Sequence, residues 1–178
     1  MSDWGTLARR IRIPAGFAFA VLYLWLAHPT VRSIIAGGAV AGIGLAIRAW
    51  ASGHVSKAAE ITQSGPYAYT RNPLYLGSIV IGAGFALASL SLWIAFGMLV
   101  LFLAVYVPVI RWEEAWLRAH LDGFDGYAAR VPRLLPRLSP AGVPGAFSRE
   151  RYLKHREYNA LLGAAAMLVA LVIKLRFF

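Results

Sequence analysis

The sequence predicts an all-α protein: a multi-pass transmembrane helical bundle of about five spans, two of which form a helical hairpin. Apolar residues make up 59% of the 178 residues, compared with about 45–50% in soluble domains. Charged residues make up only 15%, where about 25% is usual. The apolar residues also lie in long runs, as in helices that cross a bilayer. These features argue against a disordered chain, a coiled coil or an ordinary soluble enzyme.

The apolar runs predict one membrane domain, residues 1–178. The first two spans are expected within residues 13–51, as Ile13 to Val31 and then Ser33 to Ala51, with Arg48 extending to the interface. Residues 74–110 carry no charge and would form about 55 Å of helix at 1.5 Å per residue. That is too long for one crossing of a roughly 30 Å core, so we expect a hairpin that turns near Ser89-Leu90-Ser91. The last span is expected within residues 158–178.

The net charge of +10 comes from basic residues that flank the apolar runs. This placement favours contact with anionic lipid headgroups over nucleic acid. If Arg9, Arg10 and Arg12 face the cytoplasm, the polar stretches 52–73 and 111–157 are both cytoplasmic, as the positive-inside rule favours. The compact, Ala- and Arg-rich chain suggests a bacterial cytoplasmic membrane. No metal is expected, because the chain has no cysteine and its four histidines show no ligand spacing.

Because the two polar stretches flank the hairpin, its first residues should lie close to its last. Asn72 is a suitable N-cap and Pro73 a suitable first helical residue. A helix N-terminus beside Arg71 is able to bind a carboxylate or a phosphate. The structural alternative is a turn, a cap, Arg71 on lipid headgroups, and an interfacial belt of Tyr67, Tyr69 and Tyr75.

At the other end of the hairpin, Glu113 and Glu114 are adjacent carboxylates that would be costly if they faced lipid. One of them could accept hydrogen bonds from ribose hydroxyls or an amine. The alternative pairs Glu114 with Arg118 four residues later and leaves Glu113 in water. The proline-rich segment that follows either lies on the membrane surface or closes over a site and excludes water. For His54 we expect a solvated loop position, with proton transfer or ligand contact as the alternative.

Two motifs resemble those of integral membrane methyltransferases, the isoprenylcysteine carboxyl methyltransferase and phospholipid N-methyltransferase superfamily. The first is Gly65-Pro66-Tyr67…Tyr69…Arg71-Asn72-Pro73-Leu74-Tyr75-Leu76-Gly77. The second is Glu113-Glu114-x-x-Leu117…Phe124…Tyr127…Val131-Pro132-Arg133…Pro136. The similarity covers about residues 53–136, nearly half of the chain.

The resemblance implies that S-adenosyl-L-methionine binds in a cytoplasmic cofactor pocket, between the hairpin ends and the folded-back C-terminal segment. Catalytic or acceptor-positioning roles are expected for Arg71, Asn72 and Arg133. Many members have His where this chain has Asn72, which keeps a hydrogen-bonding side chain but cannot act as a base near neutral pH. The residues expected to contact the cofactor are Tyr69, Asn72, Pro73, Tyr75, Gly77, Glu113, Glu114, Leu117 and Tyr127.

The expected function is therefore methyl transfer from S-adenosylmethionine to a lipid or lipophilic acceptor, at a carboxylate or an amine. Such an in-line displacement requires positioning and exclusion of water more than an acid–base relay. Membrane lipids are the expected partners, and the oligomeric state stays open. Two alternatives remain. One is an NADPH-dependent membrane reductase of the sterol-reductase type, and the other is a non-enzymatic protein that binds lipid through its Gly/Ala faces.

Overall fold

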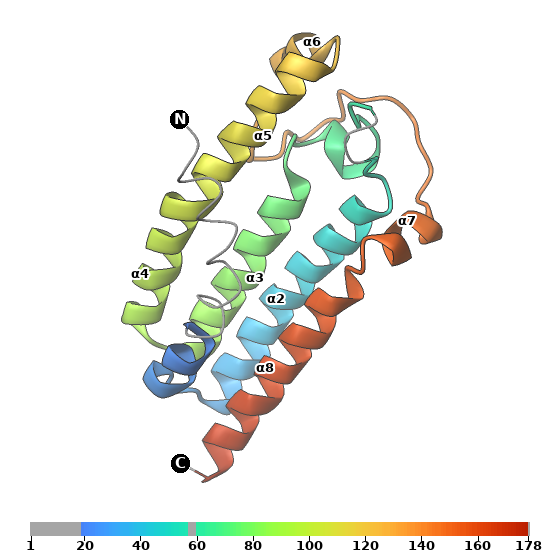
Figure 1. Ribbon diagram of the computed structural model, residues 1–178. Coiled ribbons are helices and arrows are strands. Elements are labelled where there is room, and N and C mark those ends of the chain that lie inside the picture. The colour runs from blue at the N-terminus through green and yellow to red at the C-terminus, as the bar shows by residue number, and fades with distance from the viewer. Residues whose placement is uncertain (1–18, 57–59, 178) are drawn as a thin grey trace.

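The computed structural model describes residues 19–56 and 60–177, and within them the chain is all-helical, with no strand (Figure 1). A helix at residues 19–26 comes first. The remaining elements are α2 (Val31–Ser52), the 3-10 turn η1 (Gly65–Ala68), α3 (Pro73–Ser89), α4 (Leu92–Leu101), the π-helical turn η2 (Phe102–Tyr106), α5 (Val107–His120), α6 (Phe124–Arg130), α7 (Arg149–Lys154) and α8 (Tyr158–Phe177).

Three helical segments of the described chain are long and apolar enough to cross a membrane: α2, the continuous rod Leu92–His120, and α8. The apolar helix α3 is shorter, with 17 residues. The expected second span lies within α2. The expectation of about five spans stays a prediction, because residues 13–18 of the first span lie outside the described residues.

The expected end of the first span at Val31 is wrong, because the helix ends at residue 26 and Val31 is already the first residue of α2. Pro29 disfavours helical backbone at the residue before it. Thr30 then starts α2 with a capping box: its side chain accepts from Ser33 N, and Ser33 Oγ accepts from Thr30 N. Local cap chemistry therefore divides one apolar run into two helices.

Helices α2 and α3 pack against each other through small residues. A Cβ atom added at Gly44 of α2 would lie 2.6 Å from the carbonyl oxygen of Gly77, and one added at Gly84 of α3 would lie 2.5 Å from that of Gly37. Only glycine permits such a close approach of two helix backbones, as in other membrane helix pairs. The pair α2–α3 is therefore the tightly packed centre of the bundle.

The hairpin between α3 and α4 turns at Leu90, which has a left-handed backbone with φ +51°. The sequence-based position of this turn is confirmed. Ser89 Oγ donates to the Ala86 carbonyl at 2.7 Å, and Ser33 Oγ of α2 donates to the Ala88 carbonyl at 2.9 Å. These bonds satisfy carbonyls at the end of α3 that the helix leaves unpaired.

Beyond the turn, α4, η2 and α5 form one rod that rises past the other end of α3 and carries α6 (Figure 1). The chain then runs back across the ends of α3 and α2, as residues 131–148, to α7 and α8. Helix α8 lies along α2 in the same view. The hydrophobic core of this arrangement includes Tyr23, Ala41, Phe85, Ile94 and Leu171.

We expect Gly84→Val to destabilise the fold by about 3 kcal/mol, because overpacking between two backbones forces them apart. The matched control is Gly42→Val in α2, where an added Cβ atom meets no other atom within 4 Å. Unfolding of the detergent-solubilised protein followed by circular dichroism measures both. Equal stability of the two variants would contradict the close packing of α2 and α3.

Candidate functional site

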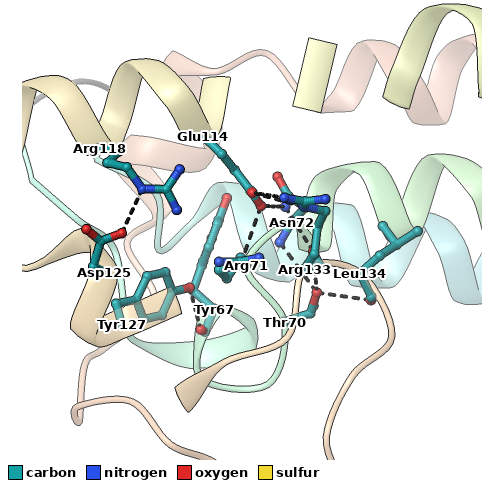
Figure 2. Close-up of polar contacts among 10 residues, drawn as sticks. All are labelled: Tyr67, Thr70, Arg71, Asn72, Glu114, Arg118, Asp125, Tyr127, Arg133 and Leu134. Carbon is teal, nitrogen blue, oxygen red and sulfur yellow. Dashed lines mark hydrogen bonds and ion pairs between the residues drawn. The ribbon is translucent and has the colours of Figure 1, made fainter. Parts of the chain in front are cut away.

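The centre of the candidate site is the carboxylate of Glu114 on α5, whose residue is only 2% exposed. Figure 2 shows the groups that surround it. Asn72 Nδ2 donates to Oε1 at 3.1 Å, and Arg133 Nε donates to Oε2 at 2.9 Å. Arg71 Nε forms a longer ion pair with Oε1, at 3.4 Å. The two ends of the hairpin therefore meet, as the sequence predicts.

The guanidinium groups of Arg71 and Arg133 both face the buried carboxylate of Glu114. Arg71 Nε is buried, and none of the described residues accepts a hydrogen bond from it in good geometry. The Arg71 guanidinium also lies 5.9 Å from the centre of the Phe124 ring, as in a cation–π contact. The cluster therefore suits a ligand with an anionic group that Arg71 could bind.

The loop before α3 positions Arg71 and Asn72. Gly65, with φ +58°, and Pro66 begin η1, which turns the chain towards α3. Pro73 is the first residue of α3, as predicted, and Asn72 occupies the N-cap position. The Asn72 side chain does not cap the helix, however. It donates instead to Glu114 and, at 2.9 Å, to the carbonyl oxygen of Arg133.

The segment after α6 lies across this loop and is held by its backbone. Arg71 N donates to the Pro132 carbonyl at 2.9 Å, Arg137 N to the Tyr69 carbonyl at 3.0 Å, and Ala141 N to the Ala68 carbonyl at 2.9 Å. Thr70, which is 2% exposed, adds a side-chain bond from Oγ1 to the Leu134 carbonyl at 3.0 Å. We call residues 131–143 the fold-back segment. It brings Arg133 to Glu114.

A second small core supports the fold-back segment. Phe124, Tyr127 and Val131 are buried, and Leu117 of α5 packs against them. Tyr127 Oη donates to the Tyr67 carbonyl at 2.8 Å. Burial raises the pKa of Tyr127, so the phenol keeps the proton that this bond needs. Tyr127 and Leu117, both expected to contact a cofactor, thus join α5 and α6 to the loop before α3.

The other predicted site residues lie around the cluster in different environments. Pro73 is buried at the start of α3, and Glu113 is partly buried beside Glu114. The Tyr69 ring lies 6.3 Å from that of Trp50, and the Tyr75 ring meets that of Tyr106 edge to face at 5.7 Å. Gly77 packs against Gly44 and Arg48 of α2, so its place in the fold is a helix contact.

Two sequence-based interpretations are wrong: the pairing of Glu114 with Arg118, and the solvated position expected for His54. Arg118 does not pair with Glu114; its Nε bonds Asp125 Oδ1 at 2.7 Å, and both side chains are exposed. His54 is not solvated, because it is only 4% exposed. Its Nδ1 lies 3.1 Å from Ser64 Oγ, and its ring contacts those of Trp50 and Phe147. Burial lowers the pKa of His54, and the positive charge of Arg151 lowers it further.

Sequence reasoning missed a second charged cluster. Arg48 of α2, expected to extend to the interface, bonds both carboxylate oxygens of Glu157 at 2.9 Å or less. It also donates to Ser78 Oγ at 2.6 Å. A charged residue near the end of a membrane helix is itself a signal of a functional position. That signal does not identify the partner of Arg48, because Glu157 lies 109 residues further along the chain.

Two open cavities, of about 390 and 440 Å³, lie between the helices. Ser78, Gly82, Met98 and Tyr106 line both of them. None of the residues expected to contact a cofactor lines either cavity. The expected cytoplasmic cofactor pocket therefore stays a prediction.

Residues 12–122 match the phospholipid methyltransferase family. The chain belongs to this family. The match covers more than half of the chain and confirms the resemblance seen in the two motifs. It ends before Tyr127 and Arg133, so the fold-back segment lies outside it.

Two curated relatives are similar to this phospholipid methyltransferase family member. The nickel-cobalt-cadmium resistance protein NccN of Alcaligenes xylosoxydans xylosoxydans is 32% identical over 117 residues, which are 65% of this chain and 54% of the relative. The cobalt-zinc-cadmium resistance protein CzcN of Cupriavidus metallidurans is 33% identical over 102 residues, 55% of this chain and 47% of the relative. The chain thus spans about half the length of these relatives. No solved structure matches it.

We expect Glu114→Gln to lower the free energy of unfolding by about 2–3 kcal/mol, because it removes the buried negative charge that faces the guanidinium groups of Arg71 and Arg133. Asp125→Asn is the control, since it breaks the exposed pair with Arg118 and should cost about 1 kcal/mol or less. Denaturant titration in detergent measures both. A Glu114 variant as stable as the Asp125 variant would contradict a structural role for the cluster.

Stability should fall as pH falls through the range in which an unfolded histidine takes up a proton. Folded His54 has a lowered pKa, so the unfolded state binds more protons there, and stability rises with pH. His54→Gln should flatten this dependence, whereas the same change at exposed His120 should not. Hydrogen exchange of residues 60–66 and 143–155 between pH 5.5 and 7.5, a window around the ordinary histidine pKa of about 6.5, measures the effect. An unchanged slope in His54→Gln would refute it.

Proposed function

We propose that this chain is an S-adenosylmethionine-dependent methyltransferase that methylates a lipid or lipophilic acceptor at the cytoplasmic face of a membrane. Its membership of the phospholipid methyltransferase family supports methyl transfer. The observation that carries the proposal is the contact between Asn72 Nδ2 and Glu114 Oε1, which joins the two motifs across 42 residues of sequence. The acceptor atom is a carboxylate oxygen or an amine nitrogen.

The residues of the cluster fit the polar groups of S-adenosylmethionine. The unsatisfied Nε of Arg71 suits the carboxylate of its methionine part. Glu113 and Glu114 are acceptors for its amine or its ribose hydroxyls. When bound, the cofactor supplies an electrophilic methyl group on a sulfonium. Arg71 and Arg133 would hold the anionic group, and binding would replace part of their contact with Glu114.

The residues at the site act by positioning and by exclusion of water. The fold-back segment covers part of the loop before α3 and buries Thr70 beneath it. Asn72 holds the carbonyl oxygen of Arg133 through its amide and therefore keeps this segment in place. A bound cofactor would supply the methyl group and the leaving thioether for an in-line displacement, and the residues of this chain would hold it in line with the acceptor.

Calorimetric titration of the detergent-purified protein with S-adenosylmethionine and S-adenosylhomocysteine tests the proposal. We expect saturable binding that Glu114→Gln weakens about tenfold or more, as expected for loss of a hydrogen bond to a charged group. Glu113→Gln is measured beside it. Asp125→Asn, which changes an exposed carboxylate, is the control and should bind normally.

The same titration separates the alternatives. A folded protein that binds neither compound with lipid restored would overturn the proposal. Binding of NADPH instead would identify the reductase alternative. Retained function in both glutamate variants, without any cofactor binding, would favour the non-enzymatic lipid-binding alternative.

A further inference from the structure

The fold-back segment carries an exposed apolar surface that the rest of the described chain leaves uncovered. Leu135 and Leu138 are 79% and 104% exposed, although hydrogen bonds hold the backbone beside them. The Leu134 carbonyl and Arg137 N both bond to the loop before α3. The two leucines are therefore presented outward by a backbone that is fixed on both sides of Leu135.

Two arginines lie beside these leucines without a carboxylate partner among the described residues. Arg137 Nη1 donates to the Arg130 carbonyl at 2.7 Å, at the end of α6, so the Arg137 side chain lies against Arg130. Arg130 Nη2 has a neutral partner, Gln63 Oε1, at 3.3 Å. The ion pairs of the described chain involve other arginines. No described carboxylate therefore balances the positive charge at this place.

Aromatic contacts relate this surface to the ends of the candidate membrane spans. Trp50 lies near the end of α2, and Tyr158 is the first residue of α8. Both are exposed, as in the aromatic belts at membrane interfaces. The Tyr69 ring contacts that of Trp50, and the Tyr69 carbonyl accepts the bond from Arg137 N. The fold-back segment thus crosses the bundle near the level at which these spans end (Figure 1).

The chain continues the same pattern of charge and apolar side chains up to α8. Residues 130–156 contain seven Lys and Arg residues and one acidic residue, Glu150. Exposed apolar side chains recur between these charges, at Val143, Phe147 and Leu153. Basic residues that alternate with apolar ones are typical of segments that lie in the interface of an anionic membrane. Because this surface adjoins the spans, a lipid surface fits it better than an acidic protein.

We propose that the fold-back segment is an anchor to an anionic lipid surface and that this anchor controls the Glu114 cluster. The two exposed leucines insert at the boundary between headgroups and acyl chains, and Arg130 and Arg137 bind lipid phosphates. The anchored segment keeps Arg133 at the cluster, so anionic lipid favours the closed arrangement of the site. The control of the site, though not the anchor, rests on the proposed methyltransferase function.

A spin label measures the depth of this anchor. Because the chain has no cysteine, Leu138→Cys provides a single site for a nitroxide, and the exposure of Leu138 means that the change removes no packing. The protein is studied in nanodiscs of phosphatidylcholine alone or of equal parts phosphatidylcholine and phosphatidylglycerol. Power-saturation EPR compares collisions with oxygen, which concentrates in lipid, and with a water-soluble nickel complex. Asp122→Cys, in the exposed turn before α6, is the control.

We expect the label at Leu138→Cys to collide mainly with oxygen and to lie deeper when phosphatidylglycerol is present. The label at Asp122→Cys should stay in water in both lipids, because α5 carries it past the end of the bundle (Figure 1). A label at Leu138→Cys as accessible to nickel as the control would overturn the anchor. Equal immersion in the two lipids would overturn it as well, since the arginines would then have no part in it.

Hydrogen exchange of residues 132–141 measures how firmly the segment is held. Phosphatidylglycerol should slow this exchange about tenfold or more, because each arginine near an anionic surface adds to the binding. High salt should remove most of the effect by screening. Equal protection by inorganic phosphate added to phosphatidylcholine nanodiscs would overturn the assignment, because the ligand would then be a free anion.

Variants separate the charge of the two arginines from their contacts within the protein. The double variant Arg130→Gln/Arg137→Gln should lose the effect of phosphatidylglycerol on exchange. Arg130→Lys/Arg137→Lys keeps both charges and should retain it. Arg32→Gln, exposed at the opposite end of α2, is the control and should behave as the wild type. Loss of the effect in the lysine variant as well would assign the arginines a structural role and would overturn the anchor.

Calorimetry with S-adenosylmethionine in the two kinds of nanodisc separates this proposal from the proposed function. We expect binding about tenfold tighter in the presence of phosphatidylglycerol, in line with the change in exchange. Binding of equal strength in both lipids would refute the control of the site alone. Lipid-dependent immersion and protection without any cofactor binding would refute the methyltransferase function and support the anchor by itself.

Discussion

The buried carboxylate of Glu114 joins three parts of the chain that are distant in sequence: the start of α3, α5 and the fold-back segment. A carboxylate in this position is tolerated only when opposite charges and hydrogen-bond donors surround it. Arg71, Asn72 and Arg133 supply them, so their places are set by one group. Figure 1 shows why this matters, since α5 rises past the end of α3 rather than along it. The cluster ties that part of the rod to the bundle.

The close contact of α2 and α3 supplies the rigid base for this arrangement. Glycines let the two backbones touch, and Arg48 extends the same contact to Ser78 and to Glu157 at the start of α8. The position of Asn72 at the head of α3 is therefore fixed by packing deep in the bundle. Because the contact of α2 with α3 does not depend on the Glu114 cluster, the proposed exchange of a cluster contact for a ligand would leave this base in place.

The sequence predicts those parts of the fold that depend on local chemistry or on the length of an apolar run. The charge-free stretch from 74 to 110, the turn at Leu90 and the start of α3 at Pro73 are of this kind. The contact between Arg133 and Glu114 could not be predicted, because the segment that carries Arg133 has no helical or strand periodicity. His54 is similar: its burial depends on Phe147, far along the chain. Local pairing favoured Arg118 for Glu114, but Arg118 bonds Asp125 at the start of α6, just after the chain turns at Gly123.

The contacts of Asn72 show what an amide does at this position, where the resemblance implies His in many members of the family. Its amide donates to Glu114 and to the carbonyl oxygen of Arg133 at the same time, and neither contact involves the transfer of a proton. A displacement at a sulfonium carbon needs a nucleophile in line and a dry site, and the acceptor supplies the electron pair. In the proposed reaction, an amide that fixes the fold-back segment over the site would serve the exclusion of water without any transfer of a proton.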